Sequence, residues 1–370
     1  MRTVSPTVLV VFLSLASACG DREPLDPLPD QNTTAQAEAR GAGLFRVTVL
    51  TQNMYPGTNL DLVVAALASP DPTDDAPALA LAIQTLQETD ISARASLLAD
   101  EIERKRPHAV ALQEVSTFHI AAAIAGQDID LDFLPILEAA LAAQDLHYVA
   151  VGVGTNYTLT PIPGISYSQG DALLIDADRV AVGIAAHHVF TYNIGEIAPG
   201  ITLRQGWSAA DASVEGRRTI FVSTHPEANF GGNSLAQLRA AQVSELVGTL
   251  PADVPVVVMG DLNDEPGSPM YQVLLGAGMT DLWRALRPGA AGNTCCHDDN
   301  LADHVARLDE HIDYIFARGF GHGAAGVQGK IGLFGDQPSE RIAGPLHPLW
   351  ASDHAGLVAT LNRPPGAARN

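Results

Sequence analysis

The sequence predicts an α/β layered fold whose strands end in polar residues along one edge. Apolar, strand-like runs alternate with helix-like stretches from Leu44 to about residue 362. Several runs stop at a polar group, as the run ending at Leu112 does before Gln113 and Glu114. Strands and helices that share a chain in this way are typical of layered α/β folds. No linker or internal repeat interrupts the region, so we expect one domain over residues 44–362.

The individual elements follow from local patterns. Short β-branched or apolar runs predict strands, and Ala- and Leu-rich stretches with helical spacing predict helices. The basic residues 104–106 fit the C-terminal end of the first helix, where they complement its dipole. Strands are predicted at residues 46–51, 108–113, 171–175, 219–224, 254–259, 312–317 and 356–361, and helices at residues 76–103, 131–144 and 234–250.

The composition is that of a globular protein with a strongly acidic surface. Hydrophobic residues make up 46 % of the 370 residues and charged residues 17 %. Lys and Arg number 21 against 42 Asp and Glu, which gives a formal net charge of −21. Such a chain gains no long-range attraction to a polyanion, so extended nucleic acid is the less natural partner. The simpler alternative is that the charge only keeps the surface soluble. We expect a monomer.

The N-terminus has the pattern of an export signal. Arg2 is followed by the apolar run 8–15, which is too short to span a bilayer. The small residues 16–18 then precede Cys19, which resembles a bacterial lipobox, where the Cys is lipidated after cleavage. Ala16 stands where Leu is commonest, so ordinary signal-peptidase cleavage stays an alternative.

We therefore predict a signal at residues 1–19, a tether at 20–43 that is rich in Pro, Asp and Ala, and a tail at 363–370. The protein would be exported, either secreted or held in the cell envelope as a lipoprotein. Its only membrane contact would then be a lipid on Cys19.

Two further cysteines, Cys295 and Cys296, are adjacent. In an oxidising compartment they could form a disulfide with each other, since a lipidated Cys19 is no partner. Two buried thiols are the alternative. The Asp and His residues from His297 to His311 lack the regular spacing of a zinc site, so we interpret that stretch as a solvated loop.

Hard oxygen ligands and imidazoles follow the predicted strands. Carboxylate and amide oxygens with few thiols suit Mg²⁺, with Mn²⁺ or Ca²⁺ as alternatives, rather than structural zinc. Hydrolysis of a phosphate ester needs charge stabilisation, a positioned water and a proton donor for the leaving group, and this set offers each of them. The residues concerned are Asn53, Glu114, His225, Asp261, Asn263, Asp313, Asp353 and His354.

These segments resemble, in order, the motifs of the endonuclease/exonuclease/phosphatase superfamily, whose fold is DNase I-like. Each motif is weak alone, but six in the right order are specific. The resemblance covers roughly residues 44–362 and implies a four-layer sandwich of two packed mixed β-sheets flanked by helices. The motifs are Gln52-Asn53, Gln113-Glu114, Thr224-His225, Gly260-Asp261-Leu262-Asn263, Ile312-Asp313-Tyr314 and Ser352-Asp353-His354.

The resemblance also implies a role for each residue. Glu114 would be the main metal ligand, with Asn53 beside it and Asp353 assisting. Asp261 would align or deprotonate the attacking water, and Asn263 would hold the phosphate. His354, oriented by Asp313, would contact the phosphate or act as a base. His225, oriented by Asp171, would face the leaving group or the scissile phosphate.

Three functions are compatible with the sequence. The first is hydrolysis of a phosphodiester, in a lipid head group or a small phosphoester, by direct attack of water, since no Ser, Cys or Asp nucleophile constellation is evident. The second is a secreted metal-dependent nuclease, which the acidic charge disfavours. The third is a binding module that kept the fold, which would not require the full set of site residues. Substrate choice is expected to lie in loops such as 145–170 and 289–308.

Overall fold

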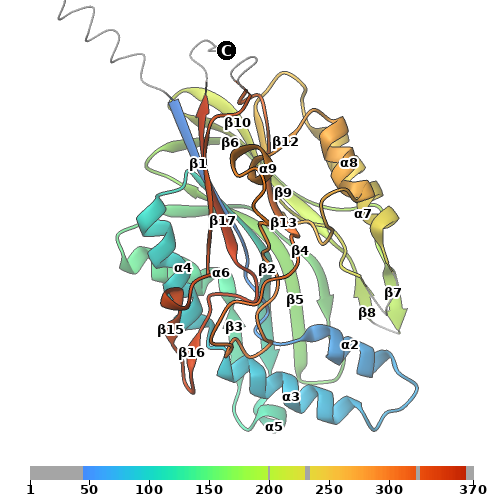
Figure 1. Ribbon diagram of the computed structural model, residues 1–370. Helices are drawn as coiled ribbons and strands as arrows, with labels where there is room; N and C mark the ends of the chain where they lie inside the picture. The colour runs from blue at the N-terminus through green and yellow to red at the C-terminus, as the bar shows by residue number, and fades with distance from the viewer. Residues whose placement is uncertain (1–44, 199–200, 230–233, 322–325, 364–370) are drawn as a thin grey trace, which may run out of the picture. The chain divides into compact units, whose positions relative to one another are not determined.

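Two β-sheets pack between helices in the part of the chain that the structure, a computed structural model, describes (Figure 1). The described residues are 45–198, 201–229, 234–321 and 326–363. The predicted signal, the tether, Cys19 and the tail beyond Arg363 lie outside them. Among the described helices, none has the length and apolar character needed to cross a membrane.

The first sheet has seven strands and both parallel and antiparallel neighbours. Its order is β14-β17-β1-β2-β5-β4, and β3 pairs with the end of β2 on the edge opposite β5. β1 runs parallel to β2 and antiparallel to β17. The strands are β1 (Phe45–Asn53), β2 (Ala109–Ile120), β3 (Ile129–Asp132), β4 (Tyr148–Leu159), β5 (Ile165–Asp176), β14 (Gly329–Phe334) and β17 (Gly356–Arg363).

The second sheet has six strands in the order β12-β13-β11-β10-β9-β6, and it is also mixed because only β10 and β11 are parallel. Two small two-stranded sheets lie outside it. The strands are β6 (Val180–Val189), β9 (Gly206–Val214), β10 (Arg217–His225), β11 (Val256–Asp261), β12 (Thr280–Asp281), β13 (Asp313–Arg318), and the small pairs β7 (Gly195–Ala198) with β8 (Ile201–Leu203) and β15 (Ile342–Ala343) with β16 (Pro348–Leu349).

Helices cover the outer face of each sheet, with α4 and α6 on one side and α7 and α8 on the other (Figure 1). The predicted four-layer α/β sandwich is therefore confirmed. The helices are α2 (Leu60–Ala68), α3 (Asp75–Glu88), α4 (Ile91–Lys105), α5 (Ala122–Ala125), α6 (Phe133–Ala143), α7 (Ala236–Thr249), α8 (Pro269–Gly276), α9 (Leu282–Leu286) and the 3-10 turn η2 (Pro338–Glu340).

Alternation along the central strands builds the layers. In β11, Val257 and Met259 face the first sheet, whereas Val256 and Val258 face α7 and α8. Successive side chains of a strand point to opposite faces, so an uninterrupted apolar run is buried on both sides. This explains why the run at 254–259 is apolar at nearly every position.

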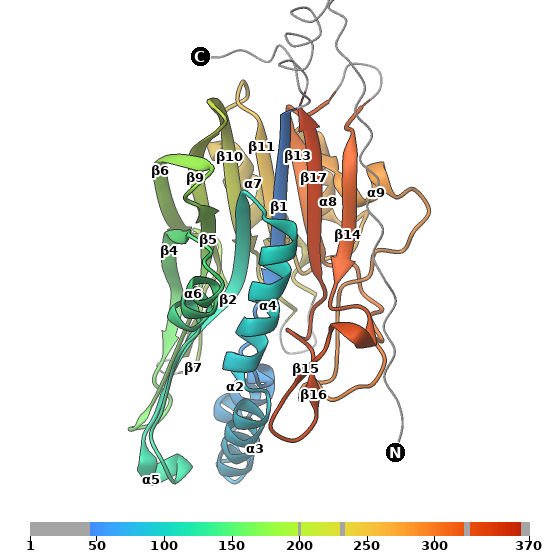
Figure 2. The same cartoon turned by 90° about the vertical axis from the view of Figure 1, so that its left-hand side faces the viewer.

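One edge of the sandwich collects the ends of six strands. Because β1 is parallel to β2 and β10 to β11, the C-terminal ends of these pairs lie at the same edge of their sheets. β13 and β17 run the other way and begin there, so Asp313 pairs directly with Asp261. Figure 2 shows α2, α3, β15 and β16 beyond this end of the strands.

Two predictions about local structure are wrong. The expected helix 76–103 is two helices, α3 and α4, because Asp90 leaves the helical conformation and caps the second helix by accepting hydrogen bonds from the amides of Ser92 and Ala93. The expected loop 145–170 contains β4 and the start of β5. β4 is an edge strand whose glycines, Gly152 and Gly154, hide its alternation.

Candidate active site

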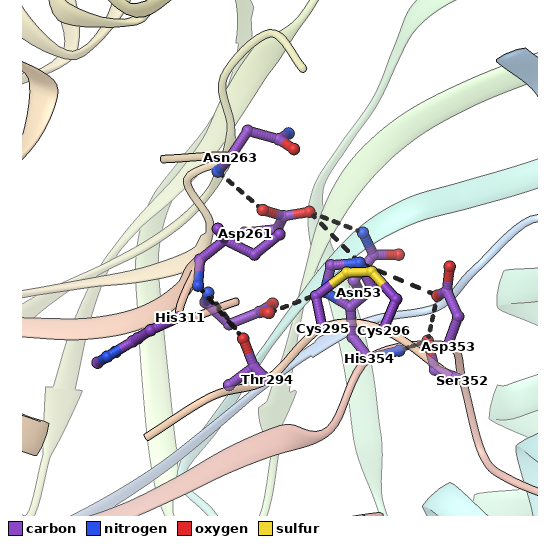
Figure 3. The surroundings of a disulfide bond; sticks show 12 residues. Asn53, Asp261, Asn263, Thr294, Cys295, Cys296, His311, Ser352, Asp353 and His354 are labelled. Atoms are coloured by element: carbon purple, nitrogen blue, oxygen red, sulfur yellow. Dashed lines mark hydrogen bonds and ion pairs between the residues drawn. A yellow bond between two sulfur atoms is a disulfide. The ribbon is translucent and has the colours of Figure 1, made fainter. Parts of the chain in front are cut away.

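Asp261 lies at the centre of the polar strand ends. Its Oδ2 accepts a hydrogen bond from Nδ2 of Asn53 at 3.1 Å and lies 3.6 Å from Nε2 of His225 and 3.9 Å from Nε2 of His354. Its Oδ1 accepts a hydrogen bond from the amide of Asn263 at 2.9 Å (Figure 3). One carboxylate therefore joins residues from both sheets, as the convergence of strand ends predicted.

The residue before Asp261 has to be glycine. A Cβ on Gly260 would collide with the carbonyl oxygen of Thr224 on the neighbouring strand β10. Glycine therefore lets β10 and β11 approach closely just before they deliver His225 and Asp261 to the site.

A β-bulge presents Glu114. The β2–β5 ladder shifts register between Leu112 and Val115, and Glu114 has a φ of 55°. Bulges re-aim side chains, and left-handed non-glycine residues concentrate at functional sites. Oε1 of Glu114 lies 3.9 Å from Nε2 of His225. Burial, followed by the charge of Asp353, raises the pKa of Glu114 to about 8.

His354 and Asp313 form a buried pair. Nδ1 of His354 lies 2.8 Å from Oδ2 of Asp313, which leaves Nε2 facing Asp261 and Asp353. Burial alone would lower the pKa of His354, but the carboxylates of Asp313 and Asp353 outweigh it and raise the pKa well above its ordinary value. The predicted pairing of these two residues is what the geometry shows.

His225 is the less basic of the two histidines. Burial lowers its pKa despite the nearby charge of Asp261. Its Nδ1 is buried and makes no hydrogen bond within the described residues. The two imidazoles thus differ in environment: His354 favours the protonated form and His225 the neutral form, which is an arrangement suited to an acid and a base.

We expected Asp171 to orient His225; Oδ1 of Asp171 and Nδ1 of His225 are both buried without a hydrogen-bond partner among the described residues. Asp171 is fully buried, and its Oδ2 accepts a hydrogen bond from Nδ2 of Asn156 at 2.9 Å. No hydrogen bond or ion pair joins Asp171 to His225 among the described residues. The register of β5 sets Asp171 opposite Gly154, next to Asn156 on β4.

A cavity of about 360 Å³ opens over the site. Six of the predicted residues line it, whereas Asn53 and Asp313 lie buried behind Asp261 and His354. Among the described residues of its wall, none is Lys or Arg. A larger hollow of about 1150 Å³ beside α2 and α3 contains none of the predicted residues, so size alone does not mark the site. The six residues are Glu114, His225, Asp261, Asn263, Asp353 and His354.

The segment around the paired cysteines forms one wall of this cavity. Cys295 and Cys296 are joined by a disulfide beside Asp353 and His354 (Figure 3). Thr294 holds the segment in place, because its Oγ1 accepts a hydrogen bond from the amide of Asp313 at 3.1 Å and its carbonyl accepts one from Ala355 at 2.8 Å.

The stretch that follows the cysteines is a loop in which exposed residues, such as Asp298 and His304, alternate with buried ones, such as Leu301 and Asp303, so the solvated loop that we expected is solvated only in part. His297 is its buried anchor. Nδ1 of His297 lies 2.9 Å from Oδ2 of Asp303, and Nε2 lies 2.9 Å from the carbonyl of Gly335. With both ring nitrogens occupied, His297 is not free to bind a metal.

Two residues that the sequence did not single out also shape the site. Arg94 is buried, and its guanidinium donates to the carbonyls of Met54, Tyr55 and Ala351, which flank Asn53 and Asp353. A lone Arg in the buried stripe of a helix was the signal for it. Glu227 lines the cavity, and burial raises its pKa to about 7. Its position two residues after His225 was the only hint.

The donor set fits a hard divalent cation. Glu114, Asp261 and Asp353 supply carboxylate oxygens, and no thiolate stands free because both cysteines of the cavity wall are in the disulfide. Burial raises the pKa values of Glu114 and Asp353, although the nearby charge of His354 opposes it at both carboxylates. A divalent cation among them would favour their ionised forms. Asn53 could contribute its Oδ1, which already accepts a hydrogen bond from Tyr55 but has a second lone pair.

A four-layer fold with carboxylates and two histidines at one rim defines a metal-dependent phosphoric ester hydrolase. Residues 84–354 match the Endonuclease/Exonuclease/phosphatase family. Because the match spans most of the chain, the protein belongs to this family of hydrolases, which confirms the family and the class of enzyme predicted from the sequence.

Solved structures of similar fold include an endonuclease/exonuclease/phosphatase from Beutenbergia cavernae, with 20 % identity, a TM-score of 0.55, and 86 % of this chain and 72 % of that chain covered. A protein of the endonuclease/exonuclease/phosphatase family from Leptotrichia buccalis has 16 % identity and a TM-score of 0.53, and the match covers 85 % of this chain and 99 % of that chain. The human Nocturnin catalytic domain with a bound sulfate anion has 17 % identity and a TM-score of 0.51, and the match covers 86 % of this chain and 94 % of that chain. At these identities, the structural similarity shows the fold alone. Comparison with curated proteins gives no significant match.

Proposed function

We propose that this protein is an exported, Mg²⁺-dependent phosphodiesterase that hydrolyses a lipid head group or another small phosphodiester by direct attack of water. The observation that carries the proposal is the cavity over Asp261. It gathers carboxylates and two histidines, yet none of its described wall residues is Lys or Arg. A nucleic-acid site normally tracks a phosphate backbone with basic residues. A single phosphodiester needs no such track.

The roles of the residues follow from their contacts. Glu114, Asp353 and Asn53 would hold the cation, which supplies charge stabilisation at the phosphate oxygens. Asp261, at the centre of the site, would align the attacking water and accept its proton. Asn263 is held by Asp261 through its amide and by Pro226 through its side chain, so that it would bind the phosphate in a fixed position.

The two histidines would stabilise negative charge on the phosphate and supply a proton to the leaving group. His354, held by Asp313 and protonated, would bind a phosphate oxygen. His225, at the end of β10, faces Asp261 on the neighbouring strand β11 and Glu114 on the other sheet. In this proposal it lies nearest the leaving group. Its neutral Nε2 is the atom to relay a proton there.

The export route is part of the same proposal. The pattern at residues 1–19 supports it, and the net charge of −21 suits a soluble exported protein that acts on small substrates. Cys19→Ser would release the protein from the membrane fraction if a lipid on Cys19 holds it. Retention of this variant, or recovery of the wild type in the soluble fraction, would refute the anchor.

A panel of phosphoesters tests the activity. The full chain is incubated with a chromogenic phosphodiester, a phosphomonoester, phospholipid vesicles, plasmid DNA and RNA, each with Mg²⁺, Mn²⁺, Ca²⁺ or EDTA. We expect EDTA-sensitive hydrolysis of the small diester or the phospholipid, with the highest rate in Mg²⁺. Rapid cleavage of plasmid or RNA without turnover of any small diester would establish a nuclease instead.

A further inference from the structure

Reduction of the disulfide at the cavity wall would give two thiolates beside an imidazole, which together form a set of soft metal ligands. One sulfur from each of Cys295 and Cys296 and one imidazole nitrogen of His354 lie within 4.8 Å of one another. On a tetrahedral zinc, with Zn–S bonds of about 2.3 Å, two sulfurs are separated by about 3.8 Å. The three groups are therefore close enough to share one cation after small side-chain movements. This set differs from the loop residues 297–311, because its third ligand, His354, comes from the segment before β17.

The main chain holds the three residues together independently of the sulfur–sulfur bond. Cys295 forms an isolated β-bridge with His354 and another with Glu310. The amide of His297 donates to the carbonyl of Asp353 at 2.7 Å, next to His354. Opening the disulfide would thus leave both cysteines anchored beside the histidine.

The ligand atoms are accessible and available. Cys296 is exposed and both cysteines line the cavity, so a small thiol can reach the disulfide. Because Nδ1 of His354 is engaged with Asp313, Nε2 is the nitrogen that a cation would take up. Two thiolates and an imidazole select Zn²⁺ or another soft cation over Mg²⁺.

We propose that reduction of the Cys295–Cys296 disulfide creates a Zn²⁺ site formed by the two thiolates and His354, which is separate from the Mg²⁺ site. A dithiol reductant opens the disulfide by exchange: the protein S–S bond breaks, the reductant closes its own disulfide, and two electrons and two protons end on the cysteines. Zn²⁺ then displaces the two thiol protons and the proton on Nε2 of His354, and all three protons pass to the solvent. The bound cation occupies the nitrogen that hydrolysis requires, so the enzyme stops.

Cobalt tests the site directly, because Co²⁺ occupies zinc sites and shows a sulfur-to-cobalt charge-transfer absorption only when thiolates bind it. The full chain, oxidised or reduced with a phosphine and freed of reductant, is titrated with Co²⁺. We expect the absorption in the reduced chain alone, saturating at one Co²⁺ per chain and disappearing when Zn²⁺ is added.

Three variants assign the ligands. Cys296→Ser should abolish the absorption, and Cys19→Ser, which removes the remaining cysteine, should leave it unchanged. His354→Ala should weaken Co²⁺ binding at least about tenfold. An absorption that survives in Cys296→Ser, or its absence from a reduced chain with two titratable thiols at 295 and 296, would overturn the proposal. Unfolding on reduction, seen by circular dichroism, would overturn it too, because His354 would then be lost as a ligand.

The inhibition rests on the proposed function and has its own readout. Micromolar Zn²⁺ should reduce phosphodiester turnover in excess Mg²⁺ for the reduced wild type, and should have at least about tenfold less effect on the oxidised wild type and on Cys296→Ser. Equal inhibition of all three would contradict the mechanism. A chain inactive on every phosphoester would refute the proposed function while leaving the cobalt titration valid.

Discussion

Nδ1 of His354 lies 2.8 Å from a carboxylate oxygen of Asp313, although Asp313 begins β13 and His354 precedes β17, a strand of the other sheet. The pair is buried, and the amide of Asp313 is itself held by Thr294. Such a carboxylate fixes the tautomer and the orientation of an imidazole and favours its charged form. This contact therefore decides which nitrogen of His354 faces the substrate.

Replacing Asp313 with Asn should lower kcat by about 10²–10⁴-fold, because His354 loses the partner that orients and charges it. KM should change much less. Steady-state kinetics on a chromogenic diester measure both constants. Asp253→Asn is the matched control. Asp253 is exposed and lies before the start of β11, at the end of the strand opposite Asp261, so this variant should retain wild-type rates. A kcat equal to the wild type in Asp313→Asn would exclude an orienting role.

Replacing Glu114 with Gln should raise the Mg²⁺ concentration for half-maximal activity at least about tenfold, because a ligand charge is lost. Activity of the wild type should vanish after dialysis against EDTA and return with Mg²⁺. Calorimetric titration with Mg²⁺ gives the affinity without reference to turnover. The same titration of Glu103→Gln, an exposed acid on α4, should match the wild type, and a matching result for Glu114→Gln would remove it from the metal site.

Arg94 should hold Asn53 and Asp353 in position through its hydrogen bonds to nearby backbone carbonyls. Its four hydrogen bonds to the carbonyls of Met54, Tyr55, Thr89 and Ala351 cannot all be made by a lysine. Arg94→Lys should therefore lower the free energy of unfolding by about 2–4 kcal/mol, measured by urea denaturation. It should also weaken Mg²⁺ binding, because Asn53 and Asp353 lie within two residues of the released carbonyls. Arg46→Lys, at an exposed position, is the control; equal stability of the two variants would contradict this role.

Glu227 should make stability depend on pH. Burial raises its pKa from 4.5 to about 7, so the folded state holds a proton that the unfolded state has released. The favourable contribution is complete below pH 4.5 and is lost as the pH rises to about 7. Glu227→Gln removes this loss and should be more stable than the wild type at pH 8, by at most about 3 kcal/mol, and no more stable at pH 4.5. Urea denaturation at both pH values measures the difference, and an equal difference at both would contradict the assignment.

Local pattern and motif order were enough to predict the layers and most of the site. The strand ending at Asp261 is apolar on both faces and stops at a polar turn, so its position can be read without knowing its neighbours. The same holds for the segments before Glu114 and His354. The convergence of these ends then follows from parallel pairing.

What the sequence did not predict depends on register and on contacts between distant segments. Asp171 lies on a correctly predicted strand, but its Oδ2 accepts a hydrogen bond from Asn156 of β4, a partner that the sequence did not indicate. The helix break at Asp90 has no Gly or Pro to mark it. Arg94 contacts carbonyls from three segments, one of them 257 residues away in sequence, and no local pattern reveals such a partner.

The most direct measurement is the turnover of a chromogenic phosphodiester by Asp261→Ala at saturating Mg²⁺, beside the wild type and Asp253→Asn. Asp261 contacts groups from both sheets, so our account predicts that its loss abolishes hydrolysis while circular dichroism shows the fold intact. Near-wild-type turnover by a folded Asp261→Ala would contradict the central claim that this carboxylate organises the reaction.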